Sequence, residues 1–94
     1  MNEYYLLTFE STHAAISTEK ILKPAGVTIM PVPRFISASC GISIRIKPEQ
    51  REQAEDLFRE HSELTADDYA YYHIRPDSSN KNSPPLCDRL DPIS

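Results

Sequence analysis

The residues best suited to chemistry lie in residues 31–41, where a single cysteine is surrounded by polar side chains. Arg34 supplies a cation, and Ser37 and Ser39 supply hydroxyl groups close to Cys40. A cysteine reacts as its thiolate, and nearby cations and hydrogen-bond donors favour that anion. The stretch therefore predicts a reactive thiol. A free cysteine is also often only a small buried hydrophobe, so a structural Cys40 is the competing interpretation.

The surroundings of Cys40 indicate a loop that leads into a strand. Pro31 and Pro33 stiffen the approach, because each fixes its own φ and makes the residue before it extended. Gly41 removes a side chain where a ligand or backbone has to come close. Apolar and polar residues then alternate over residues 42–46, as they do in a half-buried strand. Loops held by rigid elements are common places for binding and catalytic residues.

The rest of the chain predicts an α+β fold with six elements. Aromatic and β-branched runs indicate strands, and apolar residues at helical spacing indicate helices. The first helix begins after an N-cap, for which Ser11 is the best candidate, and ends at Gly26. In chain order the expected elements are a strand at 4–9, a helix at 12–25, a strand from residue 27 to about 31, a strand from residue 41 or 42 to 46, a helix at about 48–62 and a strand at 69–75.

This βαββαβ order is the pattern of the ferredoxin-like sandwich. The expected sheet is antiparallel, with strand order 4-1-3-2 and both helices on one face. Because the first and third strands are neighbours, Cys40 should lie beside the N-terminus of the first helix. Ser11, Thr12 and His13 then become candidate partners of the thiol, since free amides at a helix N-terminus favour an anion.

Two strings carry a family resemblance. Residues 31–41 read Pro-x-Pro-Arg-x-Ile-Ser-x-Ser-Cys-Gly, and residues 8–13 read Thr-Phe-Glu-Ser-Thr-His. Together they resemble the small bacterial proteins called "putative selenium/sulfur carrier protein-like", over residues 4–75. The resemblance implies a ferredoxin-like domain in which Cys40 accepts sulfur or selenium as a persulfide or selenopersulfide. A cysteine desulfurase-like donor and a downstream acceptor protein would be its partners, and the protein would be a relay more than an enzyme with its own turnover.

Composition excludes several other classes. The formal net charge is −4, whereas domains that bind phosphate backbones are usually basic, so no nucleic-acid partner is expected. No run of apolar residues is long enough for a bilayer, and the first residues do not form a signal peptide, so we expect a cytoplasmic protein. The chain has only 2 glycines and no closely spaced Cys/His set, so neither a nucleotide cofactor nor a metal site is expected.

The chain divides by composition into residues 1–75 and residues 76–94. The first part is the expected ferredoxin-like domain, and the polar, proline-rich second part is expected to be a flexible tail. Homodimer formation stays open at this point. The alternative function is a non-catalytic ligand-binding or regulatory module in which Cys40 is structural, because a fold does not by itself define a function.

Overall fold

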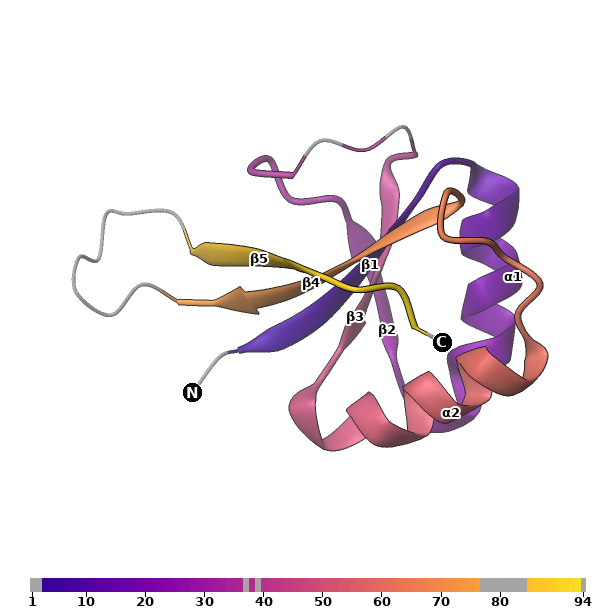
Figure 1. Ribbon diagram of the computed structural model, residues 1–94. Helices are drawn as coiled ribbons and strands as arrows, with labels where there is room; N and C mark the ends of the chain where they lie inside the picture. Colours follow the sequence, from indigo (N-terminus) through magenta and orange to yellow (C-terminus); the bar gives the residue numbers. More distant parts are fainter. Residues whose placement is uncertain (1–2, 37, 39, 77–84, 94) are drawn as a thin grey trace.

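The computed structural model describes residues 3–36, 38, 40–76 and 85–93. Within these residues an antiparallel sheet of five strands carries two α-helices on one face (Figure 1), which confirms the α+β class. No helix in this part of the chain has the length and apolar character of a membrane span. In chain order the elements are β1 (Tyr4–Phe9), α1 (Thr12–Leu22), the 3-10 turn η1 (Lys23–Ala25), β2 (Thr28–Pro31), β3 (Ile42–Ile46), the 3-10 turn η2 (Pro48–Gln50), α2 (Arg51–His61), β4 (Tyr69–Arg75) and β5 (Leu86–Leu90).

The strand order is β2-β3-β1-β4-β5. As expected, β1 pairs with β3 and β4, and β2 pairs with β3, all antiparallel. The expectation of four strands was wrong, because β5 pairs with β4 and places Leu90 opposite Tyr71. Four of the five residues of β5 are exposed, so the segment lacks the apolar alternation that marks a strand in sequence. The segment forms a strand because of its ladder hydrogen bonds to β4 and not because of its own composition.

Local signals explain how the first helix begins and ends. The Ser11 hydroxyl accepts a hydrogen bond from the Ala14 amide at 3.1 Å, which confirms Ser11 as the N-cap of α1. Pro24 tightens the end of the helix into η1. Gly26 then adopts a left-handed conformation with φ of 81°, and its amide donates to the carbonyl of Lys23. The Ser11 cap fixes the start of α1 shortly after the end of β1 at Phe9.

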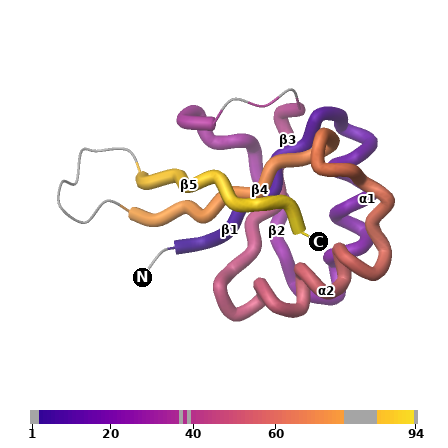
Figure 2. Tube along the Cα trace, in the orientation of Figure 1, coloured from indigo at the N-terminus to yellow at the C-terminus, as the bar shows by residue number. Residues whose placement is uncertain are grey.

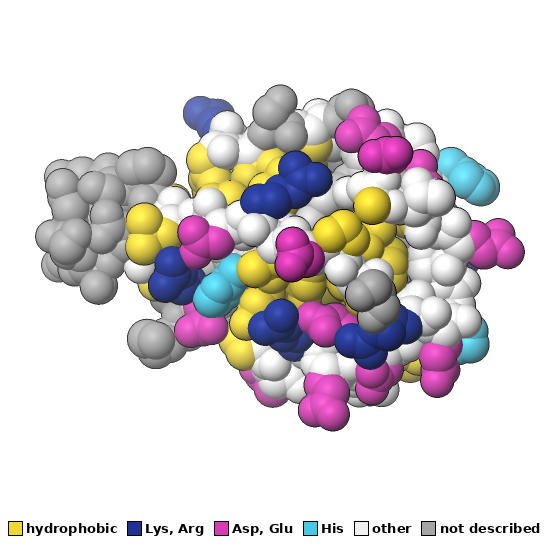
Figure 3. Space-filling view, in the orientation of Figure 1, with side chains coloured by type: hydrophobic (Ala, Val, Ile, Leu, Met, Phe, Trp, Pro, Cys, Tyr) yellow, Lys and Arg dark blue, Asp and Glu magenta, His cyan; other side chains and the backbone are white. Residues whose placement is uncertain are grey.

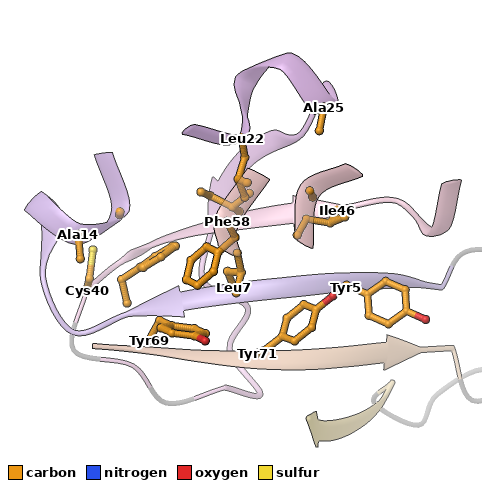
Figure 4. Packing of buried hydrophobic residues seen from close by; sticks show 14 residues of the cluster. Tyr5, Leu7, Ala14, Leu22, Ala25, Cys40, Ile46, Phe58, Tyr69 and Tyr71 are labelled. Atoms are coloured by element: carbon orange, nitrogen blue, oxygen red, sulfur yellow. The ribbon is translucent and has the colours of Figure 1, made fainter. Parts of the chain in front are cut away.

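The main core lies between the sheet and the two helices (Figure 4). Alternate residues of the central strands point into it, including Leu7 of β1 and Ile44 of β3, and Phe58 of α2 packs on them with its ring 4.8 Å from that of Tyr69. A smaller cluster of Leu6, Ile36 and Ile74 covers the other face. The loop between β2 and β3 reaches the end of the sheet where α1 begins (Figure 2). That loop carries Cys40.

A polar network ties α2 to the sheet. The Glu55 carboxylate accepts hydrogen bonds from Arg51 Nε and from the Tyr71 hydroxyl, each at 2.7 Å, and also pairs with Arg59 at 3.3 Å. Arg51 in turn donates to the Tyr5 hydroxyl at 3.0 Å. Figure 3 shows the resulting mixture of basic and acidic side chains on the surface over α2. Burial raises the pKa of Glu55, but the hydrogen bonds and the positive charges outweigh it and hold that pKa below its ordinary value.

We expect this network to make the protein less stable in acid. A carboxylate whose pKa is lower in the folded state stabilises the fold above its unfolded-state pKa, and that contribution is lost as the pH falls through the folded-state pKa. Glu55→Gln should lower the free energy of unfolding by about 1–3 kcal/mol at neutral pH. The variant should also lose less stability than the parent below about pH 4.5. Urea unfolding from pH 7 to pH 3 tests this, with the exposed Glu52→Gln on the same helix as control. Parallel curves for the parent and Glu55→Gln would contradict it.

Candidate functional site

The loop before Cys40 is anchored at both ends and on both faces of the sheet. The Val32 amide donates to the carbonyl of Gly41 at 3.1 Å, which extends the pairing of β2 with β3 by one step. The Ile36 amide donates to the carbonyl of Pro33 at 3.0 Å and closes a turn. The Ile36 side chain is buried against the helix-free face of the sheet, whereas Cys40 belongs to the core on the helix face. The loop therefore crosses the end of the sheet between two apolar anchors.

Cys40 lies beside the first turn of α1. Its amide donates to the carbonyl of Phe9 at 3.2 Å, so the last residue of β1 holds its backbone. Its Sγ accepts a hydrogen bond from the Ile42 amide at 3.4 Å and lies 3.7 Å from the Thr12 hydroxyl. Figure 4 shows the sulfur pointing toward Ala14 of α1. The side chain is 5 % exposed.

The groups around the Cys40 sulfur favour an anion at that position. The amide of Ile42 donates to the sulfur, the Thr12 hydroxyl can do the same, and the positive end of the α1 dipole is near. A thiolate and a terminal persulfide sulfur are both anions that such donors stabilise. The apolar packing around Cys40 disfavours an anion and also limits the access of other molecules to the sulfur. The site therefore combines an anion-stabilising contact set with a closed surface.

The predicted site residues are only partly brought together. Thr12 contacts the sulfur, Ser11 acts on the helix and not on the thiol, and Gly41 is exposed next to Cys40. Apart from Gly41 itself and its two chain neighbours, no atom of the described chain lies within 4 Å of the point where a side chain on Gly41 would begin. Ser37 and Ser39 lie outside the described residues.

The two predicted cations do not join this contact set. Arg34 is exposed, and no hydrogen bond or ion pair within the described part of the chain joins it to Cys40. His13 is also exposed and lines a separate hollow together with His61, between α1 and the residues that follow α2. Arg34 is six residues before Cys40 in the chain, and His13 lines this hollow and not the contact set of the sulfur. Their assignment to the thiol stays a prediction.

Sequence reasoning missed the donor that the backbone supplies. The Ile42 amide reaches the sulfur because the chain turns at Gly41 before β3 begins, and no side-chain pattern reports that geometry. Position directly before a strand is the only signal that could have suggested it. Within the described residues, no group of three or more His, Cys, Asp or Glu side chains is placed to hold a metal ion.

The fold and the thiol define a small α+β protein with one cysteine held at a helix N-terminus. The sequence matches the family described as "Putative Se/S carrier protein-like" over residues 4–69, and the chain belongs to this family. No curated protein and no solved structure matches the chain. The family match ends at the first residue of β4, so most of β4 and all of β5 lie beyond it.

The two cysteines should differ in reactivity toward a general alkylating reagent. Both are free thiols, with Cys40 buried and Cys87 exposed. Partial burial and the nearby Asp88 carboxylate raise the pKa of Cys87, which slows its reaction but leaves it accessible. We expect iodoacetamide to modify Cys87 at least about tenfold faster than Cys40 in the folded protein, because Cys40 has to wait for a local opening. Peptide mass spectrometry over time measures both rates, and urea should abolish the difference. Faster modification of Cys40 would show that its site opens freely.

Proposed function

We propose that the protein is a small thiol carrier that accepts a sulfur or selenium atom on Cys40 and passes it to another protein. The observation that carries the proposal is the contact of the Cys40 sulfur with the Ile42 amide and the Thr12 hydroxyl, in a chain that belongs to a Se/S carrier family. A relay needs one stabilised sulfur and partners that dock, and it does not need a substrate pocket of its own.

The transfer step conserves atoms and electrons. The Cys40 thiolate attacks the outer sulfur of a persulfide on a desulfurase-like donor. A new sulfur–sulfur bond forms on Cys40, the donor's sulfur–sulfur bond breaks, and the donor leaves as a thiolate that takes up the proton released when the Cys40 thiol ionised. No external oxidant or reductant is required. A selenium atom would follow the same course. Handing the atom to a thiol of the acceptor reverses these roles.

Burial of Cys40 adds a requirement to this scheme. At 5 % exposure the sulfur cannot meet a protein-bound persulfide without movement of the first turn of α1 or of the loop before Cys40. Local openings of this kind are common for functional segments. A closed resting state would protect the loaded sulfur from small thiols between donor and acceptor.

The proposal is tested by loading the protein with a cysteine desulfurase and L-cysteine, followed by peptide mass spectrometry. We expect one added sulfur on the Cys40 peptide, retained in Cys87→Ser and lost in Cys40→Ser. An established carrier loaded in parallel serves as the positive control. Sulfur on Cys87 alone, or on neither residue while the control is loaded, would overturn the proposal in favour of a binding module.

The fold we infer for the carrier is ferredoxin-like, extended by β5, and the cell compartment we infer is the cytoplasm.

A further inference from the structure

A pocket of about 210 Å³ lies where β1 ends and β4 begins. Ala38 of the Cys40 loop lines it, as does Phe9, whose carbonyl holds the Cys40 amide. The pocket therefore adjoins the segment that carries the thiol, although the sulfur itself points to the helix side of the sheet. β5 also contributes to its wall, through Arg89.

Two acidic residues reach the pocket from neighbouring segments. Glu10 follows β1 and Asp67 lies in the turn before β4, and both line the pocket. The Glu10 amide donates to the carbonyl of Asp68 at 3.0 Å, so the two segments are held side by side. The Asp68 carboxylate accepts from the Thr65 amide at 2.8 Å and keeps the turn closed. The carboxylates of Glu10 and Asp67 are thus carried on a fixed backbone.

Arg89 of β5 supplies a guanidinium group to the pocket lining. Arg89 lies opposite Tyr72 in the pairing of β4 with β5, and its guanidinium carbon is 5.7 Å from the centre of the Tyr72 ring. Contact with an aromatic face orients the planar fork of donors without using its hydrogen bonds. Such a fork matches a carboxylate in a bidentate manner. Ala38 and Ala70 line the same pocket and leave room, because their side chains are small.

We propose that this pocket binds a small zwitterion, namely a free α-amino acid with a short side chain. Arg89 takes the carboxylate, and Asp67 takes the ammonium group. A ligand that carries both charges satisfies this lining better than a simple anion or cation, because each of those would face like charge on one side. This inference goes beyond the proposed relay and does not depend on it, since it concerns reversible binding and no chemistry at Cys40.

The test uses the full chain labelled with nitrogen-15 and follows amide shifts during titration with L-alanine. Propionate and ethylamine, which each carry one of its two charges, are titrated separately. We expect saturable shifts for L-alanine at the pocket residues and at least about tenfold weaker binding of either half-molecule. No saturable shift with L-alanine would overturn the proposal. Propionate binding as tightly as L-alanine would also overturn it and leave a plain anion site.

Two variants of pocket residues, with a matched control, locate the binding. Arg89→Gln and Asp67→Asn should each weaken L-alanine binding by about tenfold. Arg75→Gln is the matched control, because it removes the 2.6 Å ion pair of Arg75 with Asp88 of the same β5 strand but does not line the pocket. Equal losses in Arg75→Gln and Arg89→Gln would mean that a loosened β5 is the cause, and would overturn the assignment. Cys40→Ser should bind as the parent does, so failure of the relay and failure of the pocket give separate results.

Discussion

Deletion of residues 76–94 will lower the free energy of unfolding by about 2–3 kcal/mol, a large part of the stability of a domain of this size. Leu90 and Ile93 pack against the core and contribute about 1 kcal/mol each when half-buried. The Ile93 amide donates to the Tyr69 hydroxyl at 2.8 Å, and that hydroxyl lies 3.3 Å from the Ile93 carbonyl. Truncation leaves this hydroxyl unpaired at the edge of the core and exposes the edge of β4.

Urea unfolding of the full chain and of residues 1–75 measures this effect, and the denaturant dependence should also fall because less surface is buried. Tyr69→Phe in the full chain removes only the hydrogen bonding between the Tyr69 hydroxyl and the Ile93 backbone, and it should lower the free energy of unfolding by about 1 kcal/mol. Arg75→Gln, which removes an exposed ion pair with β5, should cost less than about 1 kcal/mol. An unchanged midpoint after truncation would mean that residues 76–94 form a dispensable tail, as composition predicts.

The two glycines will separate stability from sulfur loading. Gly26 has φ of 81°, and a side chain there would meet the side-chain nitrogen Nε2 of Gln50 at 3.1 Å. Gly26→Ala should therefore lower the free energy of unfolding by about 1–2 kcal/mol. Gly41 has no positive φ and open space around it within the described residues. Gly41→Leu should change that free energy by less than about 0.5 kcal/mol.

The rate of sulfur loading on Cys40 should respond to the two glycine substitutions in the reverse order. Gly41 is exposed next to Cys40, so a large side chain there will obstruct the approach of a protein donor, and Gly41→Leu should slow loading by about tenfold to a hundredfold. Gly26→Ala should load at the parent rate at temperatures where it stays folded. Initial rates of persulfide formation, read by mass spectrometry, give the comparison, with Gly41→Ala as the small substitution. Parent-like loading of Gly41→Leu would show that the donor does not approach across Gly41.

The sequence by itself determined the central elements and their neighbours. The alternation at residues 42–46 and the aromatic run at residues 69–75 mark β3 and β4, because side chains of strands with one buried face repeat every two residues. Ser11 and Gly26 carry the chemistry of helix ends, and both act as predicted. Pairing of β1 with β3 follows from the element order, and it brings Cys40 to Thr12 across 28 positions.

Only the tertiary structure decided the place of β5, the closure of the site and the partners of the sulfur. Pairing with β4 orders β5 although its side chains are mostly exposed, because ladder hydrogen bonds use backbone atoms that every sequence has. The burial of Cys40 depends on how α1 packs against the end of β3, which residue types do not specify. The roles of Arg34 and His13 at the thiol stay predictions, because charge type is visible in sequence, whereas the direction of an exposed side chain is set by the backbone that carries it.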